Sequence, residues 1–138
     1  MTDVNTVAIV SSVVPAERRT EFFPRYLGGH FLKGESMIYD WARRLSAEYT
    51  GGSWEFFELS NSGFYVAPSR SNALMVEWNL NSFSDTMQPD AFGIVVTLFT
   101  LCHLSEITMD DSIIERFYAL REFALNHVDA GKIFRAVD

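Results

Sequence analysis

The chain has few of the features that mark secreted, membrane-bound or disulfide-bonded proteins. It contains a single cysteine, Cys102, in 138 residues, which excludes an internal disulfide and suits a reducing cytoplasm. Its first residues lack the basic segment that opens a signal peptide, so we expect none. The one apolar run of concern lies between Asp90 and Glu106 and has 15 uncharged residues. Because a membrane-spanning helix needs about 20, we expect a buried helix there and no membrane segment.

Basic residues are also few, with 11 lysines and arginines against 18 acids and a net charge of −7. No segment forms a basic stripe, so direct binding to nucleic acid is not expected. The acid excess is in turn too small for DNA mimicry, because duplex DNA as long as a globule of this size carries about 20 phosphate charges. Acids and arginines alternate closely, as in Glu17-Arg18-Arg19, and we interpret the excess as a contribution to solubility.

The sequence lacks the usual catalytic and metal-binding motifs. There is no HExxH, no cluster of cysteine and histidine, and no GxSxG. His103 and Glu106 stand three residues apart on an expected helix, so their side chains could point the same way. A metal site would need a further ligand, and only His30 and His127 remain as histidines. We expect no catalytic residue, metal or cofactor; a small metal-dependent or hydrolytic enzyme that uses His103 and Glu106 is the alternative hypothesis.

Apolar and aromatic side chains, by contrast, are plentiful at 48% and 14% of the residues. At this length they suffice for one core, so we expect a single domain over residues 1–138. Helices are indicated by apolar residues at spacings of three, four and seven, and by proline or acidic residues at the expected starts. The expected helices are a short one from Pro15 to Pro24, an amphipathic one over 31–49 ended by Gly51 and Gly52, an apolar core helix over 89–104, one that starts at Asp110 or Asp111, and a short last one near 133–137.

Strands are indicated in the middle of the chain. The runs 54–59 and 64–67 flank the turn-forming Ser60-Asn61-Ser62-Gly63, which predicts a β-hairpin. A third run, 74–78, would extend the hairpin into a three-stranded antiparallel meander. The predicted fold class is therefore α+β, with a small antiparallel β-sheet packed by four or five helices. The remaining segments are 6–13, a candidate fourth strand at the N-terminus, and the polar 79–88, an expected loop.

The strand over 54–59 would carry aromatic and acidic side chains together. Alternation along a strand places Trp54, Phe56 and Glu58 on one face. A solvated sheet face is one interpretation, because antiparallel sheets often expose one side to water. The other is a protein-binding patch, since aromatic anchors rimmed by acids are typical of interfaces. The candidate partner-binding residues are Trp54, Phe56, Glu58, Asn61 and Tyr65.

Several segments, in their order and spacing, resemble a known family. The most informative is 51–68, which reads GGSWEFFELSNSGFYVAP. Together with the others it resembles the ArdB/KlcA antirestriction family, small proteins carried by plasmids and other mobile elements. One position departs from the family pattern, because Ser62 stands where a second glycine is expected after Asn61. The other matching segments are 14–15, 23–28, 37–45, 93–99, 120–125 and 133–138.

The resemblance implies a biological role rather than a reaction. Proteins of this family relieve type I restriction–modification of incoming unmodified DNA in the bacterial cytoplasm. They are distinct from the strongly acidic antirestriction proteins that mimic DNA. The resemblance therefore implies a protein that evades host defence without catalysis and without DNA mimicry. The implied partner is the type I restriction complex or an associated host factor, and both alternatives stay open at this stage, as does the oligomeric state.

Overall fold

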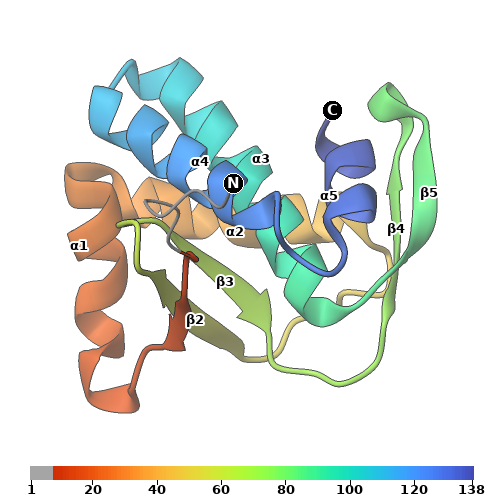
Figure 1. Ribbon diagram of the computed structural model, residues 1–138, viewed down its shortest axis with the longest axis horizontal. Helices are drawn as coiled ribbons and strands as arrows, with labels where there is room; N and C mark the ends of the chain where they lie inside the picture. The colour runs from red at the N-terminus through yellow and green to blue at the C-terminus, as the bar shows by residue number, and fades with distance from the viewer. Residues whose placement is uncertain (1–7) are drawn as a thin grey trace, which may run out of the picture.

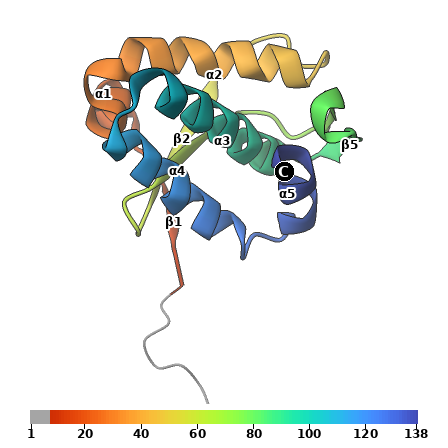
Figure 2. The ribbon, with the colours of Figure 1, turned by 90° about the horizontal axis from the view of Figure 1, so that it is seen from above.

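In residues 8–138, which the computed structural model describes, a three-stranded sheet and a separate two-stranded hairpin pack with five α-helices (Figure 1 and Figure 2). The predicted α+β class is confirmed. The strands are β1 (Ser11–Val13), β2 (Trp54–Leu59), β3 (Phe64–Pro68), β4 (Leu74–Trp78) and β5 (Phe83–Met87). The helices are α1 (Phe22–Leu27), α2 (Phe31–Leu45), α3 (Pro89–Thr108), α4 (Asp111–Ala124) and α5 (Ala130–Val137), with 3-10 helices η1 (Ala16–Glu21), η2 (Gly28–His30) and η3 (Asn79–Asn81).

The predicted hairpin of β2 and β3 is confirmed. The two strands are antiparallel, with Phe57 opposite Tyr65. Residues that lie opposite each other in neighbouring strands share a face of the sheet. Phe57 and Tyr65 therefore share one face, and Trp54, Phe56 and Glu58 lie on the other.

The predicted N-terminal strand is present as β1, which pairs with the free edge of β2. Residues 6 and 7 of that prediction lie outside the described part of the chain. Hydrogen bonds continue the pairing at both ends of β1. The Val14 N–H donates to the Phe56 carbonyl at 2.8 Å, and the Ser60 N–H donates to the Val10 carbonyl at 2.9 Å. A strand of three residues thus covers the outer edge of the hairpin.

The third predicted strand exists, but it does not extend the sheet. β4 pairs with β5 instead, with Leu74 opposite Met87. The predicted loop over 79–88 is therefore wrong, because this stretch contains η3 and β5. β5 buries Phe83 and Met87 and exposes Ser84 and Thr86, with Asp85 partly buried between them, which is the alternation of a half-buried strand. In Figure 1 the β4–β5 hairpin stands at the opposite end of the molecule from α1.

Helix α3 is the centre of the core. It is apolar on all sides, and it packs against β3, α2, α4 and α5. By length and mean hydropathy it could cross a membrane, but 61% of its most apolar window is buried within the fold, as in a core helix. Gly93 lets α3 lie directly on β3, since a β-carbon there would collide with the Val66 carbonyl and the backbone of Ala67. The Thr97 hydroxyl closes this contact, because it accepts from the Val66 N–H at 3.3 Å and donates to the Gly93 carbonyl at 2.8 Å.

Two helix boundaries differ from the sequence prediction. Pro24 does not end the first helix but lies in the first turn of α1, where a backbone N–H has no partner within the helix. The amphipathic helix, α2, ends at Leu45 rather than at Gly51, because the backbone becomes extended at Ser46. Tyr49 instead reaches the core from the following loop.

Candidate functional site

The five predicted partner-binding residues do not form one exposed patch. Trp54 and Tyr65 expose only 3% and 2% of their surface, and Phe56 is buried as well. Tyr65, on β3, also lies on the opposite face of the sheet from the predicted residues of β2, which are Trp54, Phe56 and Glu58. The predicted mixed face is covered, because Phe22 of α1 stacks on Phe56 with ring centroids 4.7 Å apart. The other two predicted residues, Glu58 and Asn61, are partly exposed.

The buried aromatic side chains of β2 already have partners within the fold. The Trp54 indole N–H donates to the Tyr49 hydroxyl at 3.0 Å. The Arg19 guanidinium lies 4.1 Å from the centre of the Phe56 ring and donates to the Trp54 carbonyl. These rings therefore stabilise the interior and offer no surface to a partner in this conformation.

Glu58 is held in a network of ion pairs and hydrogen bonds. Its carboxylate, 19% exposed, accepts from Arg18 at 3.1 Å and from the Tyr26 hydroxyl at 3.0 Å, and Arg25 lies 3.7 Å away. Burial by itself would raise the pKa of Glu58, but the hydrogen bonds from Arg18 and Tyr26 outweigh it and hold the pKa below its usual value. Glu58 is thus ionised at neutral pH and joins β2 to η1 and α1.

Asn61 fixes the tip of the β2–β3 hairpin to α4. Its side-chain amide donates to the Ala119 carbonyl at 2.9 Å and accepts from the Gly63 N–H at 3.1 Å. Ser62, which departs from the family pattern, has a positive φ of 71°, a conformation that glycine adopts more readily. The Arg116 guanidinium donates to the Ser62 carbonyl and holds the turn in place.

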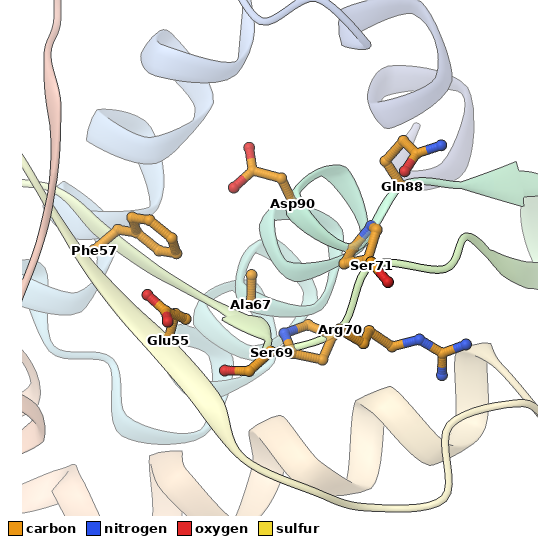
Figure 3. Close-up of a pocket in the computed structure, with 10 residues that line it drawn as sticks. Glu55, Phe57, Ala67, Ser69, Arg70, Ser71, Gln88 and Asp90 are labelled. Atoms are coloured by element: carbon orange, nitrogen blue, oxygen red, sulfur yellow. The ribbon is translucent and has the colours of Figure 1, made fainter.

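A pocket of about 590 Å³ opens between the ends of β2 and β3 and the start of α3 (Figure 3). It receives Glu55 from β2 and Asp90 from α3. The Arg70 guanidinium points away from both acids, and its Nε–H donates to the Asn72 carbonyl at 3.1 Å. Among the described residues that line the pocket there is no histidine or cysteine. Its serines therefore have no histidine beside them, the base that most often activates a serine nucleophile.

Asp90 belongs to a chain of hydrogen bonds that the sequence does not reveal. Its carboxylate accepts from the Tyr65 hydroxyl at 2.7 Å and lies 2.8 Å from Nε2 of His127. Because Nδ1 of His127 accepts from the Asp129 N–H at 2.9 Å, we assign the ring proton to Nε2, which donates to Asp90. Burial would raise the pKa of Asp90, but the hydrogen bonds from His127 and Tyr65 lower it below its usual value. Both carboxylate oxygens are occupied, so the group links β3, α3 and the segment after α4.

The residues of the alternative enzyme hypothesis lie on α3, but they do not gather a ligand set. Glu106 accepts from the Cys102 thiol at 3.7 Å, and Nδ1 of His103 is buried without a hydrogen-bond partner in residues 8–138. His30 and His127 each pair with an aspartate elsewhere, at 3.0 and 2.8 Å. Residues 8–138 hold no group of three or more histidine, cysteine, aspartate or glutamate side chains placed to bind a metal ion.

Known proteins resemble this chain along its whole length. The antirestriction protein family model matches residues 47–138. The antirestriction protein KlcA of Escherichia coli is 42% identical over 146 aligned positions, which cover 100% of both chains. A second Escherichia coli KlcA is 39% identical over 135 positions, which cover 94% of this chain and 95% of the relative.

The fold is likewise that of a solved relative. A structure from work on the KlcA and ArdB proteins has a TM-score of 0.89 and 39% sequence identity, and the match covers 97% of this chain and 99% of that one. That work describes a novel fold and antirestriction activity against type I DNA restriction systems in vivo but not in vitro. The family resemblance in the sequence is confirmed: this chain belongs to the antirestriction protein family.

Proposed function

We propose that this protein relieves type I restriction–modification of incoming unmodified DNA in the bacterial cytoplasm. The observation that carries the proposal is the match over the full chain, in sequence and in fold, to KlcA and ArdB proteins with antirestriction activity against type I systems. The fold match covers 97% of this chain, so its surface is built on the same arrangement of helices and strands as that of the relatives.

The mechanism that we propose is protein contact without chemistry. Three partly buried or paired acids are engaged in structural bonds: Glu58 with Arg18, Asp90 with His127 and Tyr65, and Asp110 with His30. General acid–base catalysis needs a group within reach of substrate protons. Groups whose oxygens already accept two hydrogen bonds are poorly placed for that role.

The distribution of charge supports a mechanism other than DNA mimicry. Several acids have their charge balanced by neighbouring bases, for example Asp85, which has Lys132 at 3.8 Å and Arg135 at 3.6 Å. Arg121 pairs with Asp138 in the same way at 3.0 Å. A DNA mimic needs a continuous row of unpaired negative charge to match about one charge per 1.7 Å of duplex. Acids that are paired with arginine and lysine cannot supply that row.

The partner that we propose is an additional host component associated with the type I complex. The solved relative acts in vivo but not in vitro, which is the behaviour of a protein that needs a cellular factor missing from a purified assay. For Glu58 and Asn61 we propose a positioning role rather than direct contact with that partner. Their hydrogen bonds hold the hairpin against α1 and α4.

The decisive experiment is the plating efficiency of unmodified phage on a host with a type I restriction system, with and without this protein. Cells that lack the system are the control, and immunoblotting of the soluble fraction establishes that the chain is present. We expect plating to rise only in the restricting host. Unchanged plating with soluble protein present would contradict the proposed function.

A second measurement separates a direct target from a host factor. Purified protein is added to a purified type I enzyme that cleaves unmodified DNA, with and without extract of cells lacking the restriction system. We expect no inhibition by the protein alone and inhibition once extract is added. Inhibition by the protein alone would show direct contact and remove the need for a host factor.

A further inference from the structure

A second hollow, of about 340 Å³, lies where α3 meets α2, β4, η3 and α5. Figure 2 shows α2 and α5 on two sides of α3, with the β4–β5 hairpin beside them. The walls are chiefly aromatic and apolar. We call this site the aromatic hollow, and its main lining residues are Trp41, Trp78, Leu80, Phe99, His103 and Glu106.

The hollow is bordered by a stripe of α3 that the fold leaves uncovered. α3 is buried along most of its length, yet Phe99, His103 and Glu106 recur at spacings of four and three and reach the surface. Leu80, at the rim, is 82% exposed. Apolar side chains that stand together in water are typical of a surface that another molecule covers.

Two lining residues hold buried polar atoms that the fold does not satisfy. Nε1 of Trp41 and Nδ1 of His103 have no hydrogen-bond partner in residues 8–138. The buried indole of Trp54 differs, since it donates to the Tyr49 hydroxyl. An unpaired buried polar group lowers stability and calls for an explanation. The Trp41 N–H can only donate, whereas Nδ1 of His103 can accept from a bound donor such as a guanidinium.

Two aromatic rings of the hollow meet edge to face and form a corner. Trp78 and Phe99 are both partly exposed, with ring centroids 5.5 Å apart and planes at 64°. Glu106 is the one carboxylate among the described residues that line the hollow, and no lysine or arginine lines it. Aromatic faces and a carboxylate together favour a guanidinium, which stacks on rings and pairs with carboxylates. The same cluster already accepts one, because the Arg44 guanidinium lies 4.6 Å from the centre of the Trp41 ring.

We propose that the aromatic hollow binds an arginine side chain presented by the protein partner of this chain. The guanidinium stacks in the corner of Trp78 and Phe99, and Glu106 pairs with it at the rim. The chain's net charge of −7 favours approach of such a basic segment. The identity of the occupant as a partner residue rests on the proposed function; binding of the arginine side chain to the hollow does not.

The binding test is an NMR titration with N-acetyl-arginine amide, and the matched control ligand is N-acetyl-citrulline amide, which has the same shape without the charge. Three indole N–H signals report on the fold, from Trp41, Trp54 and Trp78. We expect the arginine compound to shift the signals of Trp41 and Trp78 in a saturable way. The Trp54 signal should stay unmoved, because its N–H is bonded to Tyr49 outside the hollow. Equal shifts with citrulline, or none with arginine, would overturn the proposal.

Two variants place the binding in the hollow. Glu106→Gln removes the charge at nearly constant shape and should weaken arginine binding about fivefold. Glu122→Gln removes an exposed acid of α4 outside the hollow, and its affinity should equal that of the unmodified chain. An unmoved Trp54 signal in both variants establishes that they are folded. Equal weakening of arginine binding in the two variants would show a general effect of charge and contradict binding in the hollow.

The phage plating assay then tests the partner. Glu106→Gln should lower plating of unmodified phage on the restricting host, and Glu122→Gln should not. If Glu106→Gln loses arginine binding but protects phage as well as the unmodified chain does, the hollow is not the partner contact, and the proposed function stands. If the unmodified chain gives no protection, the proposed function fails, and with it the partner part of this proposal.

Discussion

The tryptophans of the two hairpins differ in burial and in their contacts. On the β2–β3 hairpin, Trp54 is buried, and its indole N–H has a partner in Tyr49. On the β4–β5 hairpin, Trp78 is partly buried and packs edge-on, at 5.3 Å between centroids, against Trp41, whose N–H has no partner within residues 8–138. Aromatic residues in the first region complete a core, whereas those in the second leave a hollow. Aromatic content alone thus says little about where a protein meets its partners.

The largest expected difference lies between Trp54→Ala and Trp78→Ala. We expect Trp54→Ala to lower the free energy of unfolding by about 3–5 kcal/mol, because it opens a cavity in a closed core. Trp78→Ala removes a ring that is partly exposed already, so it should cost less, about 2–3 kcal/mol. Chemical denaturation of the purified variants measures both values. A cost for Trp78→Ala as large as that for Trp54→Ala would contradict the distinction between the hairpins.

The contact of the first hairpin with α3 is tested at Gly93. A methyl group at this position meets the backbone of Val66 and Ala67, which cannot rotate away, so Gly93→Ala should cost about 2–3 kcal/mol. Gly131→Ala is the matched control, because in residues 8–138 no atom beyond its chain neighbours and the backbone of its own helix lies within 4 Å of the added carbon. It should be neutral or stabilise the chain by up to about 1 kcal/mol in thermal melts. Similar melting temperatures for the two variants would contradict the close approach of α3 to β3 at Gly93.

The ion-pair network of the first hairpin predicts a pH dependence. The pKa of Glu58 is lowered in the folded state, so the stabilisation by its charge is complete above the ordinary value of 4.5 and is lost as the pH falls through the folded pKa. Glu58→Gln should cost about 1–2 kcal/mol at neutral pH and reduce the loss of stability below pH 4.5. Denaturation midpoints across pH 3 to about pH 7 measure this, with Glu122→Gln as control. If Glu58→Gln loses as much stability below pH 4.5 as the unmodified chain does, other groups cause the sensitivity to acid.

The smallest expected effect compares the two indole N–H groups directly. Trp54→Phe and Trp41→Phe remove the same ring volume, but within the described residues 8–138 only the first breaks a hydrogen bond. Trp54→Phe should therefore cost about 1 kcal/mol more than Trp41→Phe in denaturant unfolding. An equal cost would mean that the Trp41 N–H finds a partner in solution, and the argument from its unpaired state would fall.

Much of the fold follows from local pattern. The β2–β3 hairpin was predictable because two β-prone runs flank a turn cluster, and α3 because its apolar run has the length of a core helix. β5 escaped prediction because Ser84, Asp85 and Thr86 dominate its composition, while only Phe83 and Met87 carry the burial. In a short edge hairpin two inward side chains suffice, and a composition argument does not detect them.

The sites were less predictable than the fold. The predicted exposure of the side chains around Trp54 was wrong, because α1 covers that face of the sheet through contacts between residues far apart in the sequence. Asp90 finds Tyr65 25 residues away and His127 37 residues away, so no spacing motif marks the group. The aromatic hollow likewise takes its walls from five elements, α2, β4, η3, α3 and α5. Burial and convergence are properties of the tertiary fold, and a sequence pattern reports only on neighbours along the chain.

The shortness of β1 has a consequence for self-association. β2 carries three aromatic residues, Trp54, Phe56 and Phe57, and an uncovered edge of such a strand is a template for pairing with another chain. Three residues and two flanking hydrogen bonds, from Val14 and Ser60, keep that edge occupied. So small a cover can detach while the core stays folded, because local opening costs less than global unfolding. When β1 detaches, the edge of β2 becomes available for pairing with a second chain, so we expect association to increase under conditions that open β1.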